Sequence, residues 1–121
     1  MNPQEYDIVT GDENKFKLIG KSWNNTIYWY QSDNLNYIEF HNTQIAVNTA
    51  NTWITTTMGY YDSSFVPNYP TYYLEIFNST TYGQGLRFNN DGTIQVRSPV
   101  TGTKSFQGVL IYPRKDKIIS E

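Results

Sequence analysis

Few side chains in this chain are suited to acid–base chemistry. His41 is the only histidine, and Glu39 and Glu75 are carboxylates within apparent strands. A pair of carboxylates can hydrolyse a glycosidic bond when the two groups flank it. Both glutamates, however, occupy alternating runs in which a carboxylate ordinarily faces solvent. The sequence has no nucleophile elbow, phosphate-binding loop or EF-hand motif, so it favours a binding protein over an enzyme.

No cofactor or metal ion is expected. The chain has no cysteine and a single histidine, which excludes thiolate and histidine-rich metal sites. Asn89, Asn90 and Asp91 carry oxygen atoms that suit Ca²⁺, but the further acidic ligands of such a site are missing. A tight hairpin turn explains Asp91-Gly92 better, because glycine accepts a positive φ.

The composition favours a ligand with many hydroxyl groups. Lys and Arg number 9 against 11 Asp and Glu, a net charge of −2, so the chain has no large basic surface for nucleic acid. It also lacks an apolar run long enough to enter a membrane. Aromatic residues make up 17% of the chain, 11 of them Tyr, and Asn, Thr, Ser and Gln are abundant. Flat rings and amide groups together are typical of saccharide sites.

The elements that must position these groups are β-strands. Val, Ile, Thr, Tyr, Phe and Trp together number 51, whereas Ala numbers 2 and Leu 5. Apolar residues recur with a period of two and never with the helical period. We therefore expect an all-β domain of about nine short strands, a compact jelly-roll-like antiparallel barrel or sandwich. The expected strands are 15–21, 27–30, 36–40, 44–47, 52–57, 72–77, 86–88, 94–97 and 109–112.

Turn residues separate these runs. We expect turns at 32–34, 41–42, 89–92 and 101–102, and a longer loop over 60–71 that contains Pro67 and Pro70. Residues 1–14 are expected to form an N-terminal strap, the remnant of a neck, or residues foreign to the domain. The domain itself spans 15–114, and 115–121 form a charged tail.

Two tryptophans raise a question of orientation. In the run Tyr28-Trp29-Tyr30, neighbouring side chains face opposite sides, so either Trp29 or the two tyrosines must point outward or into a partner chain. Trp53 precedes Ile54 and is expected in the core.

Several short motifs from residue 52 onward resemble the C-terminal head domain of tailed-phage receptor-binding proteins, most closely the lower-baseplate proteins of lactococcal siphophages. The resemblance covers about residues 20–113. The motifs that carry it are Thr52-Trp53-Ile54, Met58-Gly59-Tyr60, Pro67, Gly85-Leu86-Arg87-Phe88, Asp91-Gly92-Thr93-Ile94-Gln95-Val96 and Gly108-Val109-Leu110-Ile111-Tyr112.

This resemblance implies a homotrimeric jelly-roll head that binds saccharide on the bacterial surface and catalyses nothing. It places the domain at the virion tail tip, with host cell-wall saccharide and other baseplate proteins as partners. By position, it implies a saccharide site at Asn89, Asp91, Phe106 and Arg114. Such sites often use a Trp after the hairpin, and this chain has none there, so Phe106 or a tyrosine of the 60–61 pair would replace it. Trp23, Tyr28 and Tyr30 are candidates for subunit contacts.

Two other functions remain open at this point. A carbohydrate-binding module of a polysaccharide-degrading enzyme would share the fold and the ligand class, but such modules are usually monomeric. A trimeric cytokine-like jelly roll would act on a protein receptor. The polar, acidic N-terminus is no signal peptide, and the absence of cysteine also argues against that secreted class.

Overall fold

The computed structural model describes residues 15–69, 71–76 and 83–115, with the backbone alone at 75 and 76. The expectations for residues 1–14, for Phe77 and for most of the tail therefore lie outside the described residues. In the described part every regular element is a strand except one 3₁₀ turn, and no helix there is long and apolar enough to cross a membrane. The elements are β1 (Lys17–Ser22), β2 (Ile27–Gln31), β3 (Leu35–Val47), β4 (Ile54–Thr55), the turn η3 (Ser63–Phe65), β5 (Thr71–Ile76), β6 (Gln84–Asn89), β7 (Ile94–Arg97) and β8 (Gly102–Pro113).

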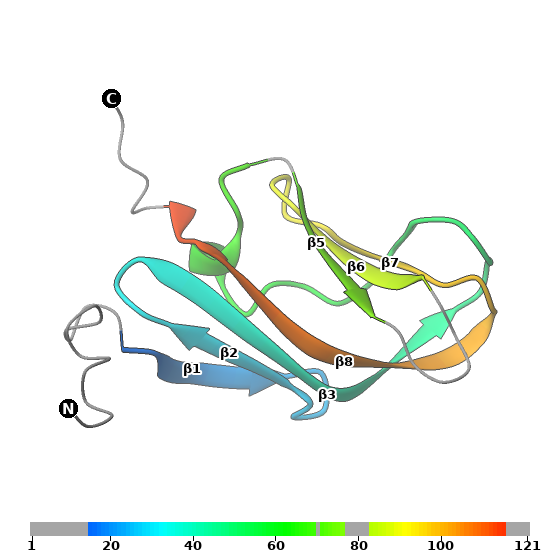
Figure 1. Cartoon of the computed structure of the whole chain (residues 1–121), viewed down its shortest axis with the longest axis horizontal. Helices are drawn as coiled ribbons and strands as arrows, with labels where there is room; N and C mark the ends of the chain where they lie inside the picture. Colours follow the sequence, from blue (N-terminus) through cyan, green and yellow to red (C-terminus); the bar gives the residue numbers. More distant parts are fainter. Residues whose placement is uncertain (1–14, 70, 77–82, 116–121) are drawn as a thin grey trace, which may run out of the picture.

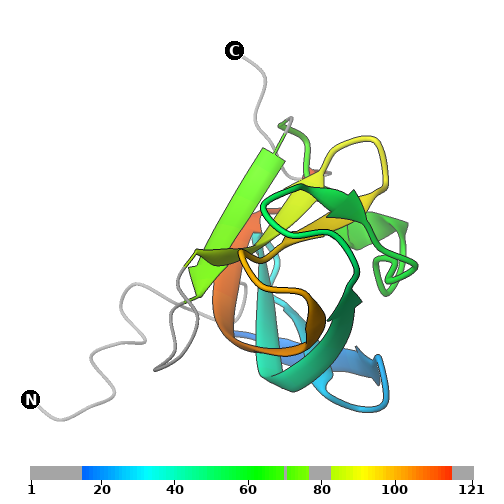
Figure 2. The same cartoon turned by 90° about the vertical axis from the view of Figure 1, so that its right-hand side faces the viewer.

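The all-β prediction is confirmed, and the strands form two antiparallel sheets. One sheet has the order β1-β2-β3-β8 and the other has the order β4-β7-β6-β5. The two sheets lie as facing layers, with the long strands β3 and β8 running side by side through one of them (Figure 1). The view turned by 90° shows the same two layers from one end (Figure 2).

The core fills the space between the layers. Trp29 of β2 is fully buried and packs edge-on against Phe65, with ring centroids 5.0 Å apart. Its indole N–H donates to Ser22 Oγ at 2.6 Å, which satisfies the polar atom of this large ring. Trp29 is thus the inward member of its run, and Tyr28 and Tyr30 face outward. The other buried apolar residues are Ile27, Ile38, Phe40, Ile45, Val47, Met58, Leu86, Phe88, Ile94, Val96, Phe106, Leu110 and Tyr112.

One expected turn is a β-bulge. The strands predicted at 36–40 and 44–47 are a single strand, β3, and the polar pair His41-Asn42 lies inside it. Between Phe40 and Thr43 the register against β8 shifts by one residue, and Asn42 has φ 50°. The extra residue changes which positions face the core. Even-numbered residues are buried before the bulge and odd-numbered residues after it.

Other boundaries also differ from expectation. The strand predicted over 52–57 is shortened to the two residues of β4. The hairpin at 89–92 is confirmed: β6 and β7 pair around it, and Gly92 has φ 94°. The loop predicted over 60–71 is confirmed for residues 60–69, where η3 is the only regular element, but Thr71 already belongs to β5.

Candidate functional site

The four residues expected to bind saccharide occupy three different environments. Asn89 ends β6, and Asp91 lies in the turn that follows, where its Oδ1 accepts hydrogen bonds from Thr93 N at 3.0 Å and Thr93 Oγ1 at 2.6 Å. Phe106 is fully buried in the core and shows no ring face to a ligand. Arg114 follows β8 and donates to Ser32 O at 3.0 Å.

These positions do not form one surface. The depression beside Arg114 is lined by residues of the β1 region and of the β2–β3 turn, and it includes neither Asn89 nor Asp91. The structure therefore brings together only Asn89 and Asp91, which share one hairpin. Asn89 also belongs to a second group of side chains, which lies on the outward side of its own sheet.

The outward side of the β4-β7-β6-β5 sheet carries aromatic rings, guanidinium groups and amides together. Alternation places them there: Leu86, Phe88, Ile94 and Val96 point into the core, so the residues between them point out. A depression of about 400 Å³ opens on this side. We call the set the Trp53 face. It consists of Trp53, Tyr73, Arg87, Asn89, Gln95 and Arg97.

The expectation that Trp53 lies in the core is wrong. Trp53 is half-buried and is absent from the core cluster. Its ring meets Tyr73 edge-on, with centroids 5.5 Å apart and an interplanar angle of 78°. The indole also lies under a cation, because Arg87 Cζ is 4.0 Å from the ring centroid. Because β4 is only two residues long, Trp53 comes just before the first paired position and is free to lie over the outer side of the sheet.

Gly85 allows the two rings to meet. It lies on β6, opposite Arg97 on β7 and opposite Glu75 on β5. A Cβ atom at position 85 would come within 2.6 Å of Tyr73 Cε1 and 3.1 Å of Trp53 Cη2. Glycine thus leaves a gap in the outer face of the sheet, and the aromatic rings occupy it.

Amide groups connect the rest of this face. Asn89 Nδ2 donates to Gln95 Oε1 at 3.0 Å, and Gln95 Nε2 lies 3.4 Å from Thr55 Oγ1. Thr71 Oγ1 donates to Asn89 Oδ1 at 3.2 Å. This row of side chains crosses four strands, and its hydroxyl and amide groups are the ones that exchange hydrogen bonds with sugar hydroxyls.

The charge on the Trp53 face is positive among the described side chains. Arg97 donates to two neutral acceptors, Gly83 O at 3.3 Å and Asn51 Oδ1 at 3.5 Å. Arg87 lies 3.5 Å from Gln95 Oε1. The ion pair found in the described residues joins His41 and Glu39 on the opposite sheet, so no described carboxylate lies within 4.0 Å of either guanidinium group.

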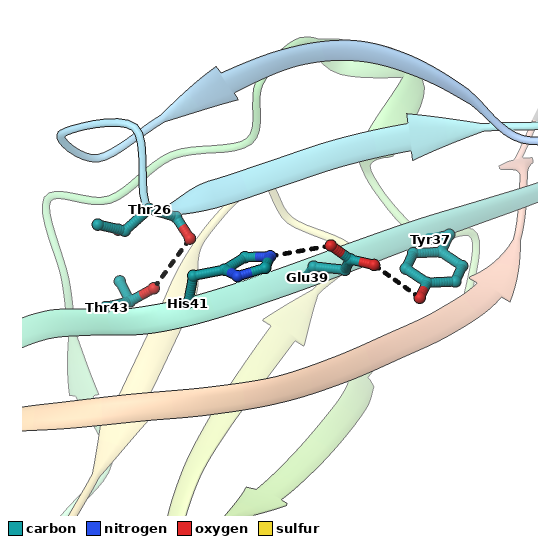
Figure 3. Close-up of polar contacts among 5 residues, drawn as sticks. All are labelled: Thr26, Tyr37, Glu39, His41 and Thr43. Carbon is teal, nitrogen blue, oxygen red and sulfur yellow. Dashed lines mark hydrogen bonds and ion pairs between the residues drawn. The ribbon is translucent and has the colours of Figure 1, made fainter.

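A second polar cluster lies on the outward side of the other sheet (Figure 3). His41 Nε2 is 2.9 Å from Glu39 Oε1, and Tyr37 Oη donates to Glu39 Oε2 at 2.8 Å. Burial raises the pKa of Glu39, but the hydrogen bonds from His41 and Tyr37 outweigh it and leave that pKa below its ordinary value. The Tyr28 ring stacks on His41 with centroids 4.2 Å apart.

This cluster does not complete a glycosidase pair. Glu39 belongs to β3 and Glu75 to β5, and these strands lie in different sheets. In the described residues no group of three or more His, Cys, Asp or Glu side chains is placed to hold a metal ion.

Comparison of the chain with protein-family models, with curated proteins and with solved structures finds no significant match. Function must therefore be argued from the site itself. Sequence reasoning selected Asn89 but missed Trp53, Tyr73, Arg87 and Arg97 as site residues. One signal was available: Arg87 and Arg97 alternate with buried residues on the two strands of the 89–92 hairpin, so both had to face the same side.

Proposed function

We propose that this chain is a saccharide-binding domain and that the Trp53 face is its binding site. The observation that carries the proposal is the pair of rings over Gly85, flanked by a row of amide and hydroxyl groups. A sugar has apolar C–H patches that pack on rings, and hydroxyl groups that need fixed donors and acceptors. Trp53 directly precedes β4, and the other groups lie on paired strands, which hold a binding geometry better than loops do.

In the larger role, we propose that the domain is the host-adsorption head of a tailed-phage receptor-binding protein. The short motifs described above support this role. The two-sheet antiparallel architecture is compatible with a jelly-roll head. In that role the domain sits at the tail tip beside other baseplate proteins and binds cell-wall saccharide.

A carbohydrate-binding module is the alternative, with the same site. The number of subunits distinguishes these two functions, because the phage role implies a homotrimer. A trimer is supported by the outward side of the β1-β2-β3-β8 sheet. There Leu18, Val109 and Ile111 are each more than 40% exposed, beside the rings of Tyr30 and Tyr37. Such a face is typical of a surface that a neighbouring subunit covers.

Two of the three residues expected to form subunit contacts lie on this face. Tyr28 and Tyr30 lie on it, and Lys21 Nζ is 4.5 Å from the Tyr28 ring centroid. Trp23 instead packs against the core, and its indole N–H donates to Gln44 O at 2.7 Å.

The experiment that tests the site compares Trp53→Ala with Tyr61→Ala. Tyr61 is an exposed aromatic residue that lies against Gly20 of the other sheet. A screen of cell-wall glycans first identifies a ligand, and calorimetric titration then measures each variant. We expect Trp53→Ala to weaken binding by about tenfold, which corresponds to about 1.4 kcal/mol. Tyr61→Ala should bind like the wild type. Unchanged binding by Trp53→Ala would exclude this face as the site.

A further inference from the structure

The indole of Trp53 is not an open platform for a sugar. The guanidinium group of Arg87 lies over it, with Cζ 4.0 Å from the ring centroid, and Tyr73 meets it edge-on. A saccharide that stacks on that side of the indole must first move the guanidinium aside. Alternatively, the sugar binds beside the stacked pair and contacts the guanidinium directly. In both arrangements the ligand meets a positive charge.

The two arginines have donors to spare. A guanidinium has five N–H donors, and a carboxylate or phosphate can accept two of them at once. The described partners of Arg87 and Arg97 are neutral oxygens at 3.3 to 3.5 Å, which are long contacts. A neutral sugar that displaces Arg87 from Trp53 removes a cation–π contact and gives no charge in return. An anionic group gives the displaced guanidinium a stronger partner.

We propose that the Trp53 face selects an anionic saccharide. The acidic group binds Arg87 and Arg97, while Trp53 and Tyr73 contact the sugar ring. This inference rests on the proposed function of that face and adds the chemical class of the ligand. The acidic group of the ligand is a carboxylate or a phosphate carried on a sugar. One pair of probes tests each of these groups.

The test uses pairs of probes in which one member carries an acidic group and the other is neutral. Oligogalacturonate and its methyl ester form the carboxylate pair, and phosphomannan and mannan form the phosphate pair. We expect the full chain to bind the acidic member of at least one pair about tenfold more tightly than its neutral counterpart. The preference should shrink as salt is added, because salt screens exposed charges. If neither acidic probe binds at millimolar concentration, or if no preference is found, the proposal is wrong.

Variants then assign the preference to named residues. Arg87→Gln should lose most of the preference for the acidic probe, so that the ratio of the two affinities approaches one. Arg97→Gln should also reduce the preference. Arg114→Gln is the control: it removes the same charge next to the other sheet, where Arg114 contacts Ser32. An equal loss in Arg114→Gln would mean that net charge, and not this face, causes the preference.

Different results would contradict the two proposals, the saccharide site itself and its preference for an anionic ligand. If Trp53→Ala abolishes binding of both probes and the arginine variants leave their ratio unchanged, the face binds saccharide without charge selection. If Trp53→Ala has no effect on either probe, the proposed site itself is wrong.

Discussion

At the scale of single residues, Gly85 decides whether the rings of the Trp53 face can meet. The added methyl group of Gly85→Ala would come within 2.6 Å of Tyr73 Cε1, closer than carbon atoms approach without displacement. We expect Tyr73 and Trp53 to move apart and saccharide binding to weaken by about tenfold or more, roughly 1.4 kcal/mol. Gly59→Ala is the matched control, because no atom lies within 4 Å of a Cβ atom at that position. Equal ligand affinities for the two variants would show that the ring pair plays no part in binding.

Asp91 illustrates a residue with a local task. Hydrogen bonds from the hydroxyl and the amide of Thr93 hold the pKa of its carboxyl below the ordinary value of 3.8. A depressed folded-state pKa means that the carboxylate stabilises the fold above the ordinary pKa, and that this contribution disappears as the pH falls through the lowered pKa. Asp91→Asn should therefore reduce the dependence of Tm on pH at acidic pH. Thermal unfolding at a series of acidic pH values measures this, and the same pH dependence of Tm in Asp91→Asn and the wild type would contradict the prediction.

At the scale of elements, the bulge in β3 keeps one long strand in contact with the core. Because one residue is added between Phe40 and Thr43, both halves of β3 place apolar side chains inward. Asn42 makes this possible by adopting φ 50°, which asparagine tolerates better than most residues.

The left-handed backbone at this position gives a stability prediction. Asn42→Val should lower the free energy of unfolding by about 1–2 kcal/mol, because a β-branched residue is strained at positive φ. Asn42→Gly relieves that strain. Both variants lose the contact from Ser105 Oγ, so that loss does not contribute to the difference between them. Denaturant unfolding measures both values, and equal stabilities would show that φ at residue 42 is unimportant.

The same bulge shows why sequence reasoning divided β3 in two. At a polar pair, the alternation of apolar and polar residues shifts by one position. The sequence pattern is the same whether the chain forms a turn or a β-bulge there, and only the pairing with β8 distinguishes the two. The alternation of Arg87 and Arg97 with apolar residues is enough to indicate which side of the sheet they face. It could not predict that Trp53 joins them, because a strand of two residues carries no usable pattern. The site combines residues of three strands with Trp53, which precedes a fourth, so which residues belong to it depends on strand register, which a single sequence does not reveal.

At the scale of the whole molecule, the two outward faces have different chemistry. One carries the cationic and aromatic Trp53 face, and the other carries the exposed aliphatic side chains of β1 and β8. A homotrimer that buries the second face leaves three copies of the first exposed. Several weak saccharide sites on one particle then bind with a combined strength that none has alone.

This arrangement predicts the effect of charge on assembly. We expect the wild-type chain to have the mass of three chains by light scattering. Ile111→Lys should reduce the mass to one chain, because a lysine would place a charge in the buried interface. Val100→Lys adds the same charge at a similarly exposed position in the loop before β8 and should leave the trimer intact. A wild-type monomer at micromolar concentration would favour the carbohydrate-binding module.

The contact between Arg87 and Trp53 also has an optical consequence. The chain has three tryptophans, and Trp29 is fully buried in the core. Trp53 has a positive charge 4.0 Å from its ring centroid, and such a charge alters the energy of the excited indole. A ligand that draws Arg87 away changes the emission of Trp53 and leaves the emission of Trp29 unchanged. If a ligand binds the Trp53 face as proposed, the emission of Trp53 reports its binding, and the affinity can be measured without a label.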